Sequence, residues 1–163
     1  PHHSSAASDV YKRQIMENGP KLIEYNARFG DPETQVLLMR LKTDLLPALI
    51  ACADGTLDQI NLDWDRSAAI CVVMAANGYP AEDKKGTSIK GLQNAGKIEG
   101  TQIFHAGTLL NQRGDLIANG GRVLGITSLG EDLTMAQKRA YAAVDLIDWT
   151  DGFCRRDIGW RAI

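Results

Sequence analysis

Apolar and polar residues follow two different patterns along the chain, and the pattern changes near residue 62. Before that point, a short apolar stretch precedes two segments whose apolar residues recur at helical intervals. After it, short apolar runs separated by Gly, Asn, Asp and Pro predict β-strands, and one helical segment follows them. We therefore expect an α+β fold. The first part cannot bury itself alone, whereas the second is a compact unit of about a hundred residues, which is an ordinary domain size.

The first predicted elements are bounded by turn and capping residues. Residues 18–20 (Asn-Gly-Pro) form a turn signal, and the run at 21–26 after them is typical of a strand. Asp31 is expected to cap the next helix, because its carboxylate can accept backbone N–H bonds and Pro32 suits the first helical position. The sequence thus predicts a strand followed directly by a helix.

A second helix is predicted from residue 43 to residue 54. Pro47 is tolerated in its first turn, and Gly55 provides a stop signal. Residues 57–66 are polar and indicate a linker before the second half begins.

The second half is predicted to contain several strands and one helix. Apolar runs bounded by turn residues favour strands at 67–76, 88–91, 101–105, 108–110, 116–119 and 122–127. Residues 111–115 between two of them are expected to form a hairpin loop. Thr134 and Gln137 have the spacing of a capping box, which predicts a helix that continues to Ile147.

The first fourteen residues differ from the rest. Residues 1–14 are polar, lack periodicity and do not show the order of a signal peptide. They are typical of non-native sequence or a disordered tail, so we expect the native sequence to begin near Ile15.

Composition excludes several classes of function. A hydrophobic fraction of 44% over 163 residues predicts a packed core. The formal net charge of −2 offers no basic excess for nucleic acid or an anionic membrane, and no apolar run could span a bilayer. Cys52, Cys71 and Cys154 are odd in number and lack C-x-x-C spacing. We interpret them as buried thiols of a reduced, cytoplasmic protein, not as a zinc site or a disulfide scaffold.

Candidate chemistry lies at Glu24, Asn26 and Arg28. Residues two apart in a strand share a face, and at ~3.3 Å per residue the first two α-carbons lie ~6.6 Å apart. Their oxygens could therefore share one hard cation such as Mg²⁺, which takes only a few ligands from protein. Arg28, one step further along, could meet the charge of a transferred phosphoryl group. A solvated strand face would give the same pattern, so spacing alone leaves both interpretations open.

Six segments of the chain add to this pattern. In chain order they are 24–35 (EYNARFGDPETQ), 73–80 (VMAANGYP), 104–108 (FHAGT), 119–124 (NGGRVL), 136–141 (AQKRAY) and 155–161 (RRDIGWR). Together they resemble the glycinamide ribonucleotide synthetase (phosphoribosylamine–glycine ligase) family of the ATP-grasp superfamily. Several motifs in the same order are more specific than any one of them. The resemblance covers roughly residues 15–163.

The resemblance implies both domains and chemistry. Residues 15–62 would be the end of an ATP-grasp domain, and 63–163 the family's small C-terminal domain of mixed sheet and helix. The implied reaction joins glycine to 5-phosphoribosylamine through glycyl phosphate, and it yields glycinamide ribonucleotide, ADP and phosphate. Glu24 and Asn26 would be the ligands of Mg²⁺ or Mn²⁺, with ATP as co-substrate. Arg28 would be the catalytic residue that stabilises phosphoryl or acyl-phosphate charge.

Two further candidates each have an ordinary structural alternative. Gly121 could let backbone N–H groups approach the phosphate of 5-phosphoribosylamine, with Arg122 completing the substrate site. The alternative is that Gly120 and Gly121 make a tight turn between strands. His105 could be a general base, but a hydrogen-bonded structural histidine is the favoured interpretation.

Two classes of function stay open. The resemblance implies that an N-terminal domain and the ATP-clamping half come first, and this chain lacks them. We therefore expect a ligase fragment that is inactive by itself and has the missing N-terminal part as its partner. The alternative is a non-catalytic ATP-grasp-derived module or subunit. A biotin-carboxylase-like ligase shares E-x-N-x-R, but R-F-G-D-P-E, F-H-A-G-T and N-G-G-R-V-L argue against it.

Overall fold

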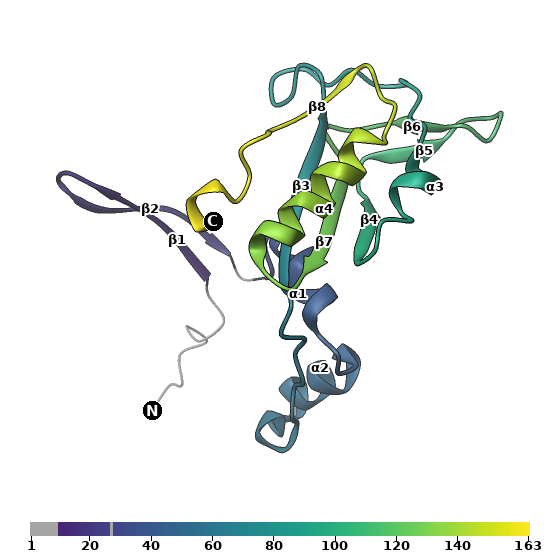
Figure 1. Cartoon of the computed structure of the whole chain (residues 1–163). Helices are drawn as coiled ribbons and strands as arrows, with labels where there is room; N and C mark the ends of the chain where they lie inside the picture. Colours follow the sequence, from purple (N-terminus) through teal and green to yellow (C-terminus); the bar gives the residue numbers. More distant parts are fainter. Residues whose placement is uncertain (1–9, 27) are drawn as a thin grey trace.

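The computed structural model describes residues 10–163 except residue 27, and it describes side chains from residue 17 onward except at 23–27 (Figure 1). Strands β1 (Val10–Met16) and β2 (Gly19–Asn26) form an antiparallel hairpin that projects from the rest of the chain. The predicted strand at 21–26 is confirmed. Residues 10–14 are not an irregular segment, because the Asn-Gly turn signal gives this polar stretch a strand partner. The expectation that residues 1–14 are non-native sequence stays a prediction.

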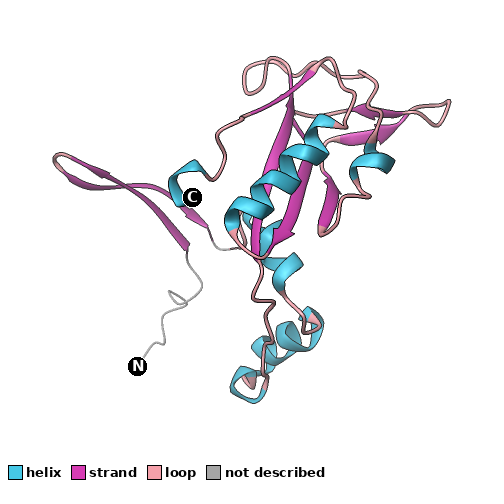
Figure 2. Ribbon diagram, in the orientation of Figure 1, coloured by secondary structure: helices cyan, strands magenta, loops and turns pink. Residues whose placement is uncertain are grey.

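A four-stranded antiparallel sheet forms the centre of the molecule (Figure 2). Its order is β4 (Thr101–His105), β7 (Arg122–Gly130), β3 (Ala68–Ala76) and β8 (Gly152–Cys154). The two long central strands pair from Ala68 opposite Gly130 to Ala75 opposite Arg122. This pairing explains why β7 extends beyond the predicted end at residue 127. The sequence did not predict β8, which is a short edge strand.

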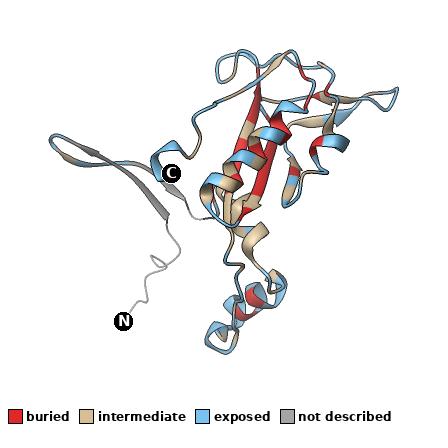
Figure 3. Ribbon diagram, viewed as in Figure 1, coloured by how far each residue is buried: buried red, intermediate tan, exposed pale blue. Residues whose placement is uncertain are grey.

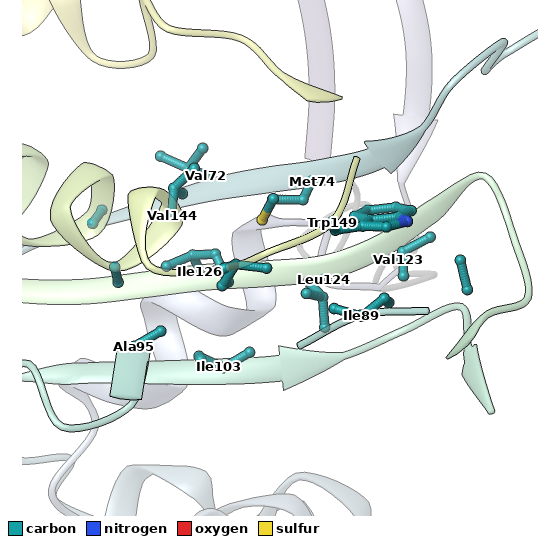
Figure 4. Close-up of a cluster of buried hydrophobic side chains, with 14 of the residues drawn as sticks. Val72, Met74, Ile89, Ala95, Ile103, Val123, Leu124, Ile126, Val144 and Trp149 are labelled. Carbon is teal, nitrogen blue, oxygen red and sulfur yellow. The ribbon is translucent and has the colours of Figure 1, made fainter. Parts of the chain in front are cut away.

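Helix α4 (Leu133–Asp145) covers one face of this sheet and encloses the core. Val72 of β3, Ile126 of β7 and Val144 of α4 are 0%, 0% and 3% exposed and lie together in Figure 4. Figure 3 shows the buried residues concentrated along the two central strands and the facing side of the helix. Trp149 closes one end of the core and donates a 2.8 Å hydrogen bond from Nε1 to Thr87 Oγ1.

The cap of α4 differs from the prediction. Asp132 is the N-cap, and its carboxylate accepts a 2.7 Å hydrogen bond from the Met135 amide. Thr134 therefore lies inside the first turn, so the predicted capping box is wrong. Gln137 instead donates a 2.7 Å hydrogen bond to the carbonyl of Ile158.

Helix α1 (Glu33–Arg40) packs against β3 and β7 on the sheet face opposite α4. The helix is confirmed, but Asp31 is not its cap. Pro32 is the N-cap and has no side-chain cap bond; the Glu33 carboxylate instead accepts a 2.8 Å hydrogen bond from the amide of Gly30. Asp31 instead lies against Arg122 of β7.

Helix α2 (Leu45–Asp54) follows α1 and confirms the predicted second helix. Asp44 caps its start, and Gly55 ends it with φ of 71°, a backbone conformation that favours glycine. The helix buries only Ala48 and Ala51, while Leu46, Leu49 and Ile50 are 61%, 53% and 53% exposed. α2 therefore presents a large apolar surface outside the core. The short helix η2 (Leu57–Gln59) lies against it.

The remaining elements are short. Strands β5 (Thr108–Leu110) and β6 (Leu116–Ala118) form the predicted hairpin. Residues 88–91 make only single bridges, so the predicted strand there is wrong. Two short helices, α3 (Leu92–Ala95) and η3 (Trp160–Ala162), were not predicted. Across the described residues, no helix has both the length and the apolar character to cross a membrane.

Candidate functional site

A pocket of about 350 Å³ opens on the sheet face opposite α4, beside the start of α1. Cys71, Val73 and Ala75 of β3 line it, because residues two apart on a strand share a face. The other lining residues are Pro32, Tyr79, Arg122, Phe153, Cys154, Arg155 and Ile158. The pocket thus combines an apolar floor with two arginines from distant parts of the sequence.

Arg122, the first residue of β7, is held at this pocket by two neighbours. Its Nη1 donates to the backbone carbonyl of Asp31 at 3.0 Å and lies 3.4 Å from the Asp31 carboxylate. Its Nε donates to the Tyr79 hydroxyl at 3.1 Å, and the guanidinium carbon lies 5.9 Å from the centre of that ring. The hydrogen bond to Tyr79 and the charge of Asp31 raise the pKa of Arg122. The side chain is therefore an oriented, permanent cation.

Gly121 makes the close approach of Tyr79 possible. A Cβ at this position would lie 2.3 Å from Cδ2 of the Tyr79 ring, well inside contact distance. The carbonyl of Gly121 accepts a 2.8 Å hydrogen bond from the amide of Ala76, which joins β7 to the end of β3. The glycine thus has a structural reason to be present. Its predicted contact with a substrate phosphate stays a prediction.

The loop from Arg28 to Glu33 places Asp31 beside Arg122. Glu33 closes this loop through its bond to the Gly30 amide, and a Cβ on Gly30 would meet the Glu33 carboxylate at 2.8 Å. The side chain of Arg28 is exposed, and its Nη1 donates a 3.1 Å hydrogen bond to the carbonyl of Phe29. The G-D-P-E part of the motif therefore has a definite geometry, which turns Asp31 toward β7.

The predicted metal ligands Glu24 and Asn26 lie in β2, but their side chains are outside the described residues. The backbone pairing is regular over this stretch, with Glu24 opposite Lys12 and Asn26 opposite Val10. The irregularity in the hairpin comes before Glu24. Among the side chains that the structure describes, no three or more His, Cys, Asp or Glu residues gather in a metal-binding group. The metal site at Glu24 and Asn26 stays a prediction.

Arg155 lies at the pocket, although we predicted no role for it from the sequence. Its guanidinium makes a two-point contact with Asp157: Nε to Oδ1 at 2.9 Å and Nη2 to Oδ2 at 2.7 Å. The neighbouring Arg156 makes a different contact, with Asp145 at 2.6 Å and the ring of Tyr141. The R-R-D motif was visible in the sequence, but its spacing does not show which arginine reaches the pocket.

Two other sequence interpretations can be compared with the structure. His105 Nδ1 lies 3.1 Å from the Thr108 hydroxyl and is not among the pocket residues, which agrees with a structural role. The interpretation of all three cysteines as buried thiols is wrong for Cys52, which is exposed on α2. Cys71 is buried at the floor of the pocket, and Cys154 is intermediate.

Comparisons with known proteins agree with the resemblance seen in the sequence. The chain is 60% identical over 149 residues to a phosphoribosylamine–glycine ligase of Mesorhizobium japonicum, covering 91% of this chain and 35% of that protein. It is 54% identical over 145 residues to a chloroplastic phosphoribosylamine–glycine ligase of Arabidopsis thaliana, covering 88% and 27%. The chain therefore spans about a third of the length of the curated relatives it matches.

The solved structures give the same result. The crystal structure of a phosphoribosylamine–glycine ligase from Thermotoga maritima matches with a TM-score of 0.71 and 31% identity, covering 89% of this chain and 35% of that one. This likeness confirms the α+β fold. Residues 69–161, more than half of the chain, match the family model described as phosphoribosylglycinamide synthetase, C domain. The chain belongs to the phosphoribosylglycinamide synthetase family, and it contains the C domain of that family.

Proposed function

We propose that this chain supplies the C-terminal third of a phosphoribosylamine–glycine ligase acting in cytoplasmic purine biosynthesis. The full reaction would join glycine to 5-phosphoribosylamine with ATP and yield glycinamide ribonucleotide, ADP and phosphate. The observation that carries this proposal is the contact between Arg122 and Asp31. It brings the G-D-P part of the first motif beside Arg122 of the N-G-G-R segment, and Pro32 of that part lines the same pocket as Arg122, which supports a shared site.

The proposed chemistry has two steps. A carboxylate oxygen of glycine attacks the γ-phosphorus of ATP, which gives glycyl phosphate and releases ADP. The amine of 5-phosphoribosylamine then attacks the glycyl carbonyl carbon, the amine loses a proton, and phosphate leaves. Neither step needs a covalent bond to the protein. The protein acts by positioning the reactants and stabilising negative charge.

Residues of this chain would contribute in two places. Glu24 and Asn26 would hold Mg²⁺ or Mn²⁺, which when bound neutralises the phosphates of ATP. Arg28, next to the same strand, would stabilise the transferred phosphoryl group or the acyl phosphate. Arg122 at the pocket, together with Gly121 before it in the sequence, would bind the substrate 5-phosphoribosylamine.

The apolar surface of α2 supports a role as part of a larger enzyme. Leu46, Leu49 and Ile50 are more than half exposed, which is unusual for neighbouring large apolar residues. The relatives are about three times as long as this chain, since the match covers 35% of the Mesorhizobium protein. We propose that the part of the ligase that precedes this chain packs on α2. The ATP-clamping elements would also belong to that part, so the isolated chain should have no activity.

The test is a chimeric enzyme in which residues 15–163 replace the matching C-terminal segment of the Mesorhizobium japonicum relative. We expect ADP release that requires both glycine and 5-phosphoribosylamine. The isolated chain, assayed beside it, should not exceed the control without enzyme. A folded chimera that binds ATP but never forms glycinamide ribonucleotide would contradict the proposal and favour a non-catalytic module. ADP release by the isolated chain would contradict its dependence on the missing part.

A further inference from the structure

The pocket brings Arg122, at the start of β7, together with Arg155, which follows β8. We propose that Arg155 and Arg122 form a two-arginine site for the phosphate monoester of a sugar phosphate. The proposed function identifies that sugar phosphate as 5-phosphoribosylamine, and to that extent this inference rests on it. The role of Arg155 itself rests on its place in the pocket and on its contacts.

The guanidinium of Arg155 is oriented and still has donors to offer. Asp157 engages Nε and Nη2 in a two-point contact, which fixes the plane of the group. Among the described contacts, none uses Nη1 of Arg155, and none uses Nη2 of Arg122. Each arginine therefore keeps N–H groups for an acceptor. Phosphate oxygens are well suited to such fork-shaped donors.

The backbone that carries Arg155 is anchored to α4. The Tyr141 hydroxyl donates to the carbonyl of Arg155 at 2.9 Å and accepts from the amide of Ile158 at 3.0 Å. Gln137 adds its 2.7 Å hydrogen bond to the carbonyl of Ile158. Both helix residues thus hold the segment in place before any ligand arrives. Preorganisation of this kind lowers the free energy spent on ordering the site during binding.

The floor of the pocket suits the rest of such a ligand. Val73, Ala75 and Phe153 line the pocket together with the two arginines and add apolar surface to it. This floor would contact the carbon-bound hydrogens of the sugar, while the phosphate would lie at the guanidinium groups, whose side chains are 43% and 68% exposed. The volume of about 350 Å³ is at the small end of the range for ligand sites, so it fits a sugar phosphate.

The charges around the two arginines favour specific hydrogen bonds to a phosphate over a general attraction of anions. Asp31 and Asp157 each lie against one of the two arginines, so the local net charge is small. A phosphate would therefore be selected by the geometry of the donors. Arg156 provides a matched comparison, because it is adjacent in sequence but pairs with Asp145 and is not among the pocket residues.

The experiment titrates the whole chain with ribose 5-phosphate, a stable sugar phosphate, and follows binding by calorimetry and amide NMR shifts. We expect Arg155→Gln and Arg122→Gln each to weaken binding by about tenfold or more, since each removes a charged donor pair. Arg156→Gln should bind as the unaltered chain does. Arg155→Lys keeps the positive charge but lacks the fork-shaped guanidinium, so its affinity for ribose 5-phosphate should lie between those of the unaltered chain and Arg155→Gln. Ribose without phosphate should not bind, and inorganic phosphate should bind more weakly than ribose 5-phosphate.

Each other result has a defined meaning. If Arg155→Gln binds normally while Arg122→Gln does not, the role of Arg155 is overturned and the substrate role of Arg122 in the proposed function survives. If ADP shifts the pocket amides and ribose 5-phosphate does not, the site is a nucleotide site and this inference fails. No binding of ribose 5-phosphate also overturns it. Activity of the chimera, measured separately, decides the proposed function.

Discussion

The backbone carbonyl of Asp31 accepts a 3.0 Å hydrogen bond from Nη1 of Arg122, a residue 91 positions later in the chain. This contact links the loop before α1 to the first residue of β7 across the edge of the pocket. Because the acceptor is a backbone atom, a change of the Asp31 side chain alone does not remove it. The relative position of the two motifs therefore depends on the fold of the loop more than on one ion pair.

The metal assignment is tested by replacing Glu24 with Gln in the chimeric ligase. If Glu24 is a metal ligand, the loss of its charge should weaken metal-dependent ATP binding and raise the Mg²⁺ concentration needed for half activity by about tenfold or more. The measurement is ADP release as a function of Mg²⁺ concentration. Glu17→Gln, in the exposed turn of the hairpin, serves as the control. Unchanged metal dependence in the Glu24 variant would sink the assignment.

Gly121→Ala should destabilise the fold by about 1–3 kcal/mol, because the new methyl group would overlap the Tyr79 ring. The measurement is the free energy of unfolding in denaturant. Removing the ring in the double variant Tyr79→Ala/Gly121→Ala should recover most of the loss that Gly121→Ala causes. If the losses in unfolding free energy from Tyr79→Ala and Gly121→Ala simply add, overlap with the Tyr79 ring does not explain why glycine is needed at position 121.

The cap of α4 can be tested with two neighbouring substitutions. Asp132→Ala should lower the free energy of unfolding by about 1 kcal/mol, because it removes the acceptor for the Met135 amide. Thr134→Ala should have little effect, since Thr134 lies inside the exposed first turn. The measurement is the free energy of unfolding in denaturant. A larger loss for Thr134→Ala than for Asp132→Ala would support the capping box that the sequence predicted.

The contact between Arg155 and Asp157 should make its contribution to the stability of the fold depend on pH. The hydrogen bonds from Arg155 lower the pKa of Asp157 below its ordinary value. A lowered folded-state pKa means that the contribution of the pair to stability is complete above about pH 4, the unfolded value, and is lost as the pH falls through the folded value. Carboxyl NMR titration should show this low pKa, and Arg155→Gln should return it toward the ordinary value. A normal pKa in the unaltered chain would contradict the pairing.

The cysteines should differ in their reactivity toward a thiol reagent at neutral pH. Burial raises the pKa of the Cys71 thiol, so little of the reactive thiolate is present. Cys52 is exposed on α2 and should be labelled first. Mass spectrometry of the labelled peptides gives the order, and Cys52→Ser should remove the fast phase. Fast labelling of Cys71 in the folded chain would show that the pocket floor is open to the reagent.

Much of the fold follows from local patterns in the sequence. β3, β4, β5 and α2 lie close to their predicted positions, because apolar runs and turn residues define them. Some wrong predictions concern which of two neighbouring residues caps a helix. Asp132 and Thr134 are both able caps, and tertiary packing selected the first. β8 is too short to show a periodic pattern and exists through its pairing with β3.

The candidate site was less accessible to sequence reasoning. Arg122 was predicted from its motif, but its contact with Asp31 depends on how the chain folds over 91 positions. Arg155 and Arg156 are identical in type and adjacent, so only the structure shows which one lines the pocket. The roles of Glu24, Asn26 and Arg28 remain predictions, since they depend on a resemblance and on spacing.

The anchoring of the segment from Arg155 to Ile158 on α4 has a consequence for the order of assembly. During synthesis, both central strands and α4 leave the ribosome before this segment does. The hydrogen bonds that hold this segment need α4 to be formed, because Tyr141 and Gln137 are residues of that helix. A nascent chain could therefore acquire a stable core and still lack one wall of the pocket.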